Sequence, residues 1–210
     1  MPSILITAFE PFGGESVNPT GLILSALPDI SCGCEVKKLL LPVEFISAPR
    51  LAVEAIDRLA PSAVLMFGQA GGRACVTPER IAVNIMDASI PDNAGLRPQG
   101  EQVVPGGPAA YFAALPVARI AEELTANGIS AAVSNSAGAY VCNALMYSVL
   151  HHLCSKDGGE HTVPAGFIHF PFISEQIEGK DPKPPAMTLE DETRAAALIL
   201  KTIAETVNSL

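Results

Sequence analysis

The chain is short of basic residues and of long apolar runs. Its 210 residues include 13 Lys and Arg against 22 Asp and Glu, so the formal net charge is −9. Because the basic residues also form no cluster, we expect neither nucleic acid nor an anionic membrane surface as a partner. No apolar stretch approaches the roughly 18 residues of a membrane-spanning helix. A chain of this length can instead build a full hydrophobic core.

Targeting and metal-binding signals are also missing. The first residues, M-P-S-I-L-I-T, do not combine a basic segment with a long apolar run, so we expect no signal peptide. There is no H-E-x-x-H motif, and Cys32 and Cys34 form C-x-C rather than the C-x-x-C of redox and zinc sites. We therefore expect no metal and no cofactor. The five cysteines, an odd number, favour a reduced, cytoplasmic protein with free thiols.

Apolar segments of strand length alternate with segments of helical period along the chain. We predict strands at residues 3–8, 36–43, 63–67, 80–86, 129–134 and 166–170. We predict helices after the capping residues Asn18, Ser47 and Thr188, over residues 116–126, and from residue 141. This alternation predicts an α/β fold, a three-layer α/β/α sandwich around a mainly parallel twisted sheet, with residues 1–210 as a single domain.

Two long segments rich in proline and glycine interrupt this alternation. They cover residues 88–108 and 171–187. Loops of this length in a compact domain usually form a lid, a binding loop or a contact between subunits.

The residues around Cys142 carry the clearest sign of chemistry. The helical period begins at Val141, directly after a small-residue turn, so Cys142 falls in the first turn of a helix. The free N–H groups and the dipole at this end of a helix favour a thiolate, which predicts a depressed thiol pKa. The same pattern also fits a small apolar residue packed under the turn.

A nucleophilic cysteine needs a base, and His169 is the best-placed histidine. His151 and His152 lie on the same helix as Cys142, about 13 Å or more along its axis. His161 lies in a polar turn. An apolar strand such as the one that holds His169 more often contains a satisfied core histidine, so composition does not decide its role, nor which carboxylate would orient it.

Two glycine-rich segments, residues 9–14 and 68–73, each follow a predicted strand. Together with the turn before Cys142 they should meet at one edge of the sheet, where open α/β sheets bind ligands. Phe9 and Phe12 could either enter the core or wall a pocket there. Residues 68–73 could hold a phosphate, but they match neither common phosphate-binding motif.

Several motifs follow one another along the chain. They are F-E-P-F-G-G, N-P-T, G-Q-A-G-G-R, P-E-R-I-A-V-N, I-P-D-N, G-G-P-A-A-Y-F, S-N-S-A-G-A-Y-V-C-N and G-F-I-H-F-P. By this ordered set the chain resembles the type I pyroglutamyl peptidases, also called pyrrolidone-carboxylate peptidases. The resemblance covers essentially the whole chain. It implies a cysteine exopeptidase that removes N-terminal pyroglutamate from peptides and assembles as a homotetramer or dimer.

The resemblance also implies roles for individual residues. Cys142 would be the nucleophile, His169 the base and Glu79 the carboxylate that orients the imidazole. The pocket for the pyroglutamyl ring would be formed by Phe9, Phe12, Asn18, Gln69, Ile90 and Val141. The two phenylalanines would sandwich the ring, and main-chain groups near Asn18 and Gln69 would pair with the lactam.

One position departs from the family pattern. Ser89 stands where the family usually carries an arginine at the active-site entrance, and the loss of a charged donor could cost roughly 3 kcal/mol of transition-state stabilisation. Arg73 or Arg80 could replace that charge. Ser89 therefore supports one competing function, a catalytically impaired protein that binds pyroglutamyl ligands. The glycine-rich turns support another, an enzyme similar to nucleoside phosphorylases that holds phosphate there, although no basic cluster is present for phosphate.

Overall fold

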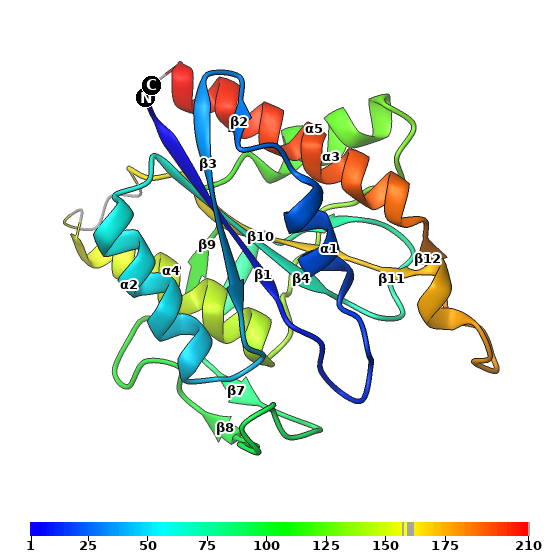
Figure 1. The fold of residues 1–210 in the computed structure, drawn as a ribbon. Coiled ribbons are helices and arrows are strands. Elements are labelled where there is room, and N and C mark those ends of the chain that lie inside the picture. Colours follow the sequence, from blue (N-terminus) through cyan, green and yellow to red (C-terminus); the bar gives the residue numbers. More distant parts are fainter. Residues whose placement is uncertain (157, 159–161, 210) are drawn as a thin grey trace.

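The computed structural model describes residues 1–156, 158 and 162–209. His161 and Leu210, for which the sequence predicts a polar turn and a place in the last helix, lie outside the described residues. A six-stranded sheet runs through the centre of the molecule in the order β2-β3-β1-β4-β10-β5 (Figure 1). Its strands are β1 (Ser3–Phe9), β2 (Ile30–Ser31), β3 (Cys34–Leu41), β4 (Ala63–Gln69), β5 (Thr77–Pro78) and β10 (Ala165–Phe170).

The four central strands, β3, β1, β4 and β10, are parallel to one another. The two outer strands run the other way, because β2 pairs antiparallel with β3 and β5 pairs antiparallel with β10. Every residue of β4 and β10 is buried, as in parallel strands covered on both faces. The predicted mainly parallel, mixed sheet is confirmed.

Successive side chains of the strands enter two separate apolar clusters. Leu5 and Met66 belong to the cluster that includes α2 and α4, whereas Ile6 and Leu65 belong to the cluster of α1, α3 and α5. This period of two gives the sheet one helical layer on each face. Figure 1 shows the two layers on opposite sides of the sheet. The helices are α1 (Pro19–Ala26), α2 (Ser47–Leu59), α3 (Val117–Ala126), α4 (Val141–Lys156) and α5 (Leu189–Asn208). The three-layer α/β/α prediction is confirmed.

Two of the three predicted helix caps are present. Asn18 accepts a hydrogen bond from the backbone N–H of Thr20, and Thr188 accepts one from the backbone N–H of Asp191. The prediction for Ser47 is wrong. Ser47 is the first residue of α2 itself, because the chain enters this helix through a turn in which the N–H of Ala48 already bonds to the carbonyl of Glu44.

The predicted strand at residues 80–86 is divided into two. β6 (Ile81–Val83) pairs with β9 (Ala110–Phe112), whereas β7 (Met86–Asp87) pairs with β8 (Gln99–Glu101). The division occurs where the side chain of Asn143 takes up the backbone groups, since it bonds to the N–H and carbonyl of Val83 and to the carbonyl of Ile85.

Residues 129–134 do not form the predicted buried strand. They make two isolated bridges, from Ala131 to Val76 and from Ser134 to Glu79, and run along the outer side of β5. Ile129 is buried, but the serines and alanines that follow have little apolar surface to place in the core, and they are partly or fully exposed.

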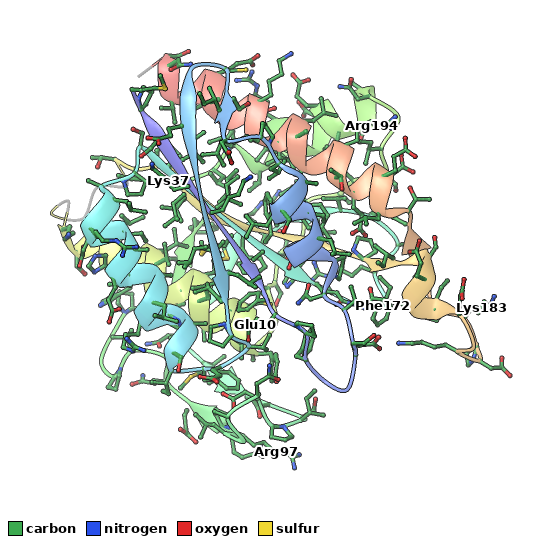
Figure 2. All side chains as sticks on the ribbon, viewed as in Figure 1. Glu10, Lys37, Arg97, Phe172, Lys183 and Arg194 are labelled. Carbon is green, nitrogen blue, oxygen red and sulfur yellow. The ribbon has the colours of Figure 1, made fainter. Side chains whose placement is uncertain are left out.

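Both proline-rich segments extend away from the sheet. Residues 88–108 contain β8, and residues 171–187 contain β11 (Phe172–Ile173), the short helix η1 (Ser174–Ile177) and β12 (Ala186–Met187). Figure 2 shows Arg97 and Lys183 at the outer ends of these two excursions. Among the described residues, no helix is both long and apolar enough to cross a membrane.

Candidate active site

A cavity of about 430 Å³ opens at the carboxyl ends of the central strands. Its walls include Phe9 at the end of β1, Gln69 at the end of β4 and His169 near the end of β10. The turn before α4 also lines the cavity, through Ser136, Ala137 and Gly138, and Cys142 of α4 lies beside them. The predicted meeting of the two glycine-rich segments with this turn is confirmed.

Glu79 and His169 form a buried pair beside this cavity. Nδ1 of His169 lies 2.7 Å from Oε1 of Glu79, and the two residues are 4% and 0% exposed. Burial pushes the pKa of Glu79 upward. Hydrogen bonds from His169, Ser134 and Arg73, together with the charge that His169 carries when it is protonated, outweigh burial, so the net pKa lies below its usual value. An ionised carboxylate accepts the bond, so Nδ1 carries the ring proton and Nε2 is available as a base.

Burial also acts on the imidazole. It lowers the pKa of His169 below its ordinary value, although the hydrogen bond to Glu79 opposes this effect. His169 is therefore neutral near pH 7. A neutral imidazole with Nε2 unprotonated can accept a proton from a neighbouring group.

Cys142 is the second residue of α4 and lines the same cavity. Its backbone N–H lies in the first turn of the helix, where it has no partner within the helix. The predicted depressed pKa is wrong: burial and the Glu79 carboxylate raise the pKa of the Cys142 thiol to about 12, against the opposing charge of Arg73. The resting site therefore pairs a neutral thiol with a neutral imidazole, and the thiolate has to form by proton transfer.

Four of the six expected pocket residues line the cavity: Phe9, Phe12, Asn18 and Gln69. Phe9 is both in the core and at the cavity, because it is 2% exposed and also packs against Phe167. Asn18 holds its surroundings in place, since its side chain donates to the carbonyl of Glu10 at 3.0 Å.

The structure does not bring Ile90 and Val141 to the cavity wall. Val141 is the first residue of α4 and is fully buried in the core, where the helix packs on the sheet. Ile90 is 44% exposed, lies near Gly13 and is not among the residues that line the cavity. The spacing of residues in the sequence could not show whether either side chain points toward the cavity or away from it.

Several wall residues were not expected from the sequence. Val43 follows β3, at the same edge of the sheet as the other strand ends, so its position in the sheet could have indicated it. Gln176 does not line the cavity, but its Oε1 accepts a hydrogen bond from Nε2 of the wall residue Gln69 at 3.2 Å. Its position in η1, far along the chain, gave no sequence signal for this contact.

The comparison with protein families decides what this arrangement is. The family model for pyroglutamyl peptidase matches residues 2–206. The chain belongs to the pyroglutamyl peptidase family. The predicted family and the predicted class of enzyme, a cysteine-type omega peptidase, are thereby confirmed.

Similar curated proteins and solved structures agree over the full chain. The pyrrolidone-carboxylate peptidase of Thermococcus onnurineus is 47% identical over 95% of this chain and 97% of its own. Pyrrolidone-carboxylate peptidase 1 of Caldanaerobacter subterraneus is 45% identical over 96% and 98%. The crystal structure of pyroglutamyl peptidase I from Bacillus amyloliquefaciens has a TM-score of 0.90 at 38% identity, covering 98% of both chains. That of pyrrolidone carboxyl peptidase from Pyrococcus furiosus has a TM-score of 0.91 at 42% identity, covering 98% and 99%.

The two arginines that could replace the charge missing at Ser89 differ in their position relative to the cavity. In this member of the pyroglutamyl peptidase family, Arg73 lines the cavity and Arg80 does not. Ser89 is exposed and is also absent from the wall. No cluster of three or more residues suited to hold a metal ion occurs in the described part of the chain.

Proposed function

We propose that this protein hydrolyses the amide bond that follows an N-terminal pyroglutamyl residue in peptides, with Cys142 as nucleophile, His169 as base and Glu79 as orienting carboxylate. The observation that carries the proposal is the single cavity shared by His169, bonded to Glu79 at 2.7 Å, and Cys142 at the start of α4. The names of the relatives support the same substrate.

The reaction begins with a proton transfer within the neutral pair. Nε2 of His169 takes the proton of the Cys142 thiol as the sulfur attacks the substrate carbonyl carbon. Glu79 stabilises the imidazolium that forms and keeps Nδ1 protonated. The oxygen of the tetrahedral intermediate becomes negative, and the free backbone N–H of Cys142 at the helix start can donate to it.

The intermediate then collapses to a thioester. The carbon–nitrogen bond breaks, and His169 gives its proton to the leaving amine, so that the shortened peptide departs with a neutral amino group. Water, deprotonated by the same imidazole, attacks the thioester carbon. The carbon–sulfur bond breaks, free pyroglutamate is released, and the thiol is restored.

The shape of the cavity suits a small neutral ring. Phe9 and Phe12 provide aromatic surface for the faces of the lactam, and main-chain groups near Asn18 and Gln69 are the partners that we assign to its N–H and carbonyl. An ordinary N-terminal ammonium would lose its hydration here without gaining a carboxylate partner, because Glu79 lies behind His169 and is itself fully buried.

The test compares two cysteines of one helix. Cys142 lines the cavity, whereas Cys154 lies twelve residues later in the last turns of α4. With a chromogenic pyroglutamyl amide, we expect the wild-type protein and Cys154→Ser to release the amine, and Cys142→Ser to release none. Prior treatment with iodoacetamide should abolish turnover by both active proteins.

Two outcomes would contradict the proposal. Full activity of Cys142→Ser would exclude this residue as the nucleophile. Binding of a pyroglutamyl amide without hydrolysis by folded wild-type protein would indicate an impaired homologue, and Ser89→Arg would then be the variant that tests whether the missing arginine is the cause.

Assembly and location belong to the same proposal. We infer a homotetramer or dimer from the family resemblance, and a cytoplasmic location from the five free cysteines. Light scattering coupled to gel filtration measures the mass of the particle directly, and a particle of 21.9 kDa would contradict the oligomer.

A further inference from the structure

Arg73 connects three segments of the active site. Its Nη1 donates to Oε1 of Glu79 and to Oγ1 of Thr77, each at 2.5 Å. Its Nη2 donates to the backbone carbonyl of Ser136 at 3.1 Å. Arg73 itself belongs to the loop that follows β4, Thr77 and Glu79 flank the end of β5, and Ser136 precedes the helix of Cys142. One guanidinium therefore contacts both the carboxylate that bonds to His169 and the turn that precedes the helix of Cys142.

We propose that Arg73 is a positioning residue, which fixes the Glu79 carboxylate against His169 and holds the turn from which the Cys142 helix begins. This inference rests on the proposed function of the site. It goes beyond that function in naming the route by which Arg73 affects the reaction, which passes through Glu79 and through the turn at Ser136.

The buried carboxylate of Glu79 gains a fixed cation in Arg73. The carboxylate is fully buried, and the side chains of His169, Ser134 and Arg73 act on it through hydrogen bonds that lower its pKa. The neutral imidazole of His169 gives Oε1 a hydrogen bond but no charge. A cation beside a buried carboxylate favours its ionised form, and the ionised form is the one that stabilises an imidazolium. A guanidinium group carries a permanent positive charge, and that of Arg73 binds the same oxygen.

The charge of Arg73 also reaches the reacting pair. The titratable or charged side chains around the Cys142 sulfur are Arg73, Tyr140 and His169, with Glu79 behind His169. The positive charge of Arg73 acts to lower the pKa of Cys142 and also that of His169. Loss of the charge should therefore leave less thiolate at a given pH and make the imidazole easier to protonate.

Arg80 provides a matched control. It lies seven residues after Arg73 and directly follows Glu79 in the chain, and its Nη1 donates to Oδ1 of Asn135 at 2.7 Å. Arg80 is exposed and contributes nothing to the cavity wall. A change of Arg80 removes the same charge and the same side chain from the neighbouring surface without touching the carboxylate of Glu79.

The experiment compares Arg73→Gln, Arg73→Lys and Arg80→Gln with the wild type. For each, three measurements are made: kcat and KM on a pyroglutamyl amide, the pH profile of kcat/KM, and the rate of alkylation of Cys142 by iodoacetamide at pH 8. We expect Arg73→Gln to lower kcat by about 10-fold to 100-fold with KM within about threefold of wild type, since positioning affects the chemical step. The acid limb of its profile should move to higher pH, and alkylation should slow by about tenfold for each unit of added thiol pKa.

The other two variants separate charge from geometry. Arg80→Gln should match the wild type in all three measurements. Arg73→Lys keeps the charge, so its acid limb and alkylation rate should stay near those of the wild type. Its kcat should still fall, because one ammonium group cannot hold Glu79, Thr77 and Ser136 with the planar geometry of a guanidinium.

A wild-type kcat, acid limb and alkylation rate in Arg73→Gln would overturn the inference. If that variant does not fold, Arg73→Lys decides, and an unchanged kcat in the lysine variant would overturn the positioning role. Failure of the wild type to cleave the pyroglutamyl amide would count against the proposed function alone. The alkylation series needs no substrate, so slower alkylation in Arg73→Gln would still support the coupling of Arg73 to Cys142, and an unchanged rate would refute it.

Discussion

The Cβ that Gly68 lacks would lie 3.0 Å from Sγ of Cys142. Gly68 stands on β4 directly opposite His169 of β10, so the residue without a side chain is the strand neighbour of the proposed base. Two ring atoms of Phe167 would lie at 2.5 and 2.7 Å from the same Cβ. Because residue 68 is a glycine, the Cys142 sulfur and the Phe167 ring can both pack against its backbone.

A methyl group at this position should damage activity and stability together. Gly68→Ala should lower kcat by about tenfold or more, because an ångström-scale displacement of the sulfur removes it from its line of attack. Overpacking against Phe167 should lower the free energy of unfolding by about 1–3 kcal/mol. Turnover of the pyroglutamyl amide and urea unfolding measure the two effects.

Gly21→Ala is the control for this change. Gly21 lies within α1, and a Cβ there would meet its nearest neighbours at 3.4 Å. In a helix interior alanine is favoured over glycine by roughly 0.5–1 kcal/mol, so this variant should be at least as stable as the wild type and fully active. Equal losses in the two variants would contradict the special role of Gly68.

The sequence predicted the sheet and the two helical layers well, because strands and helices each leave a strong periodic pattern of apolar residues. The buried runs of β1, β4 and β10 and the stripes of α2 and α5 leave few other ways to pack. Ile129 begins a segment of similar appearance, but the small residues after it add too little apolar area to form a strand. Local propensity could not reveal that the segment would lie along the outer side of β5.

The family resemblance pointed to residues most of which the fold brings to one cavity. The sequence could not show which side chains on a turn or a helix face that cavity. The pairing of Glu79 with His169 joins positions 90 residues apart, which no local pattern encodes. The pKa of Cys142 was predicted in the wrong direction because the helix dipole can be read from the sequence, whereas enclosure and the nearby carboxylate cannot. Whether Ile90 and Val141 face the cavity depends on how their segments pack against the sheet, and the packing is known only from the structure.

The two phenylalanines of the cavity should differ in how much each contributes to activity and to stability. Phe12 is only partly buried, so Phe12→Ala should reduce kcat/KM for the pyroglutamyl amide by about tenfold through lost ring contact, with a change of less than about 1 kcal/mol in the free energy of unfolding. Phe9 is a core residue, and Phe9→Ala should also cost about 3–5 kcal/mol of stability. Activity assays with urea unfolding of both variants would contradict this division if Phe12→Ala were the less stable of the two.

Asn143 should be a structural residue in spite of its place next to Cys142. It is fully buried, and its amide bonds to the N–H and carbonyl of Val83 and to the carbonyl of Ile85. Asn143→Ala leaves these backbone groups without partners, so we expect a loss of about 3 kcal/mol in urea unfolding. Asn127→Ala, which removes an exposed amide at the end of α3, should cost less than about 1 kcal/mol. A loss of activity in Asn143→Ala without a loss of stability would point instead to a direct role in the reaction.

Glu192 makes the stability of this protein depend on pH. Its side chain is fully buried in α5, neither carboxylate oxygen has a hydrogen-bond partner among the described residues, and burial together with the charge of Glu175 raises its pKa to about 8. Below pH 4.5, the ordinary pKa of a glutamate, the carboxyl is protonated in both the folded and the unfolded chain. Above that pH the unfolded chain ionises first, so the free energy of unfolding falls until the folded carboxyl ionises as well near pH 8.

The size of this effect follows from the difference between the two pKa values and is on the order of 4 kcal/mol between pH 4.5 and 8. Glu192→Gln cannot ionise, so its free energy of unfolding should decline less across this range and should exceed that of the wild type at pH 8. Glu190→Gln changes an exposed residue of the same helical turn and should keep the wild-type slope. Urea unfolding of the three proteins at pH 5, 6.5 and 8 measures the slopes, and parallel slopes for the wild type and Glu192→Gln would show that Glu192 ionises normally in the folded protein.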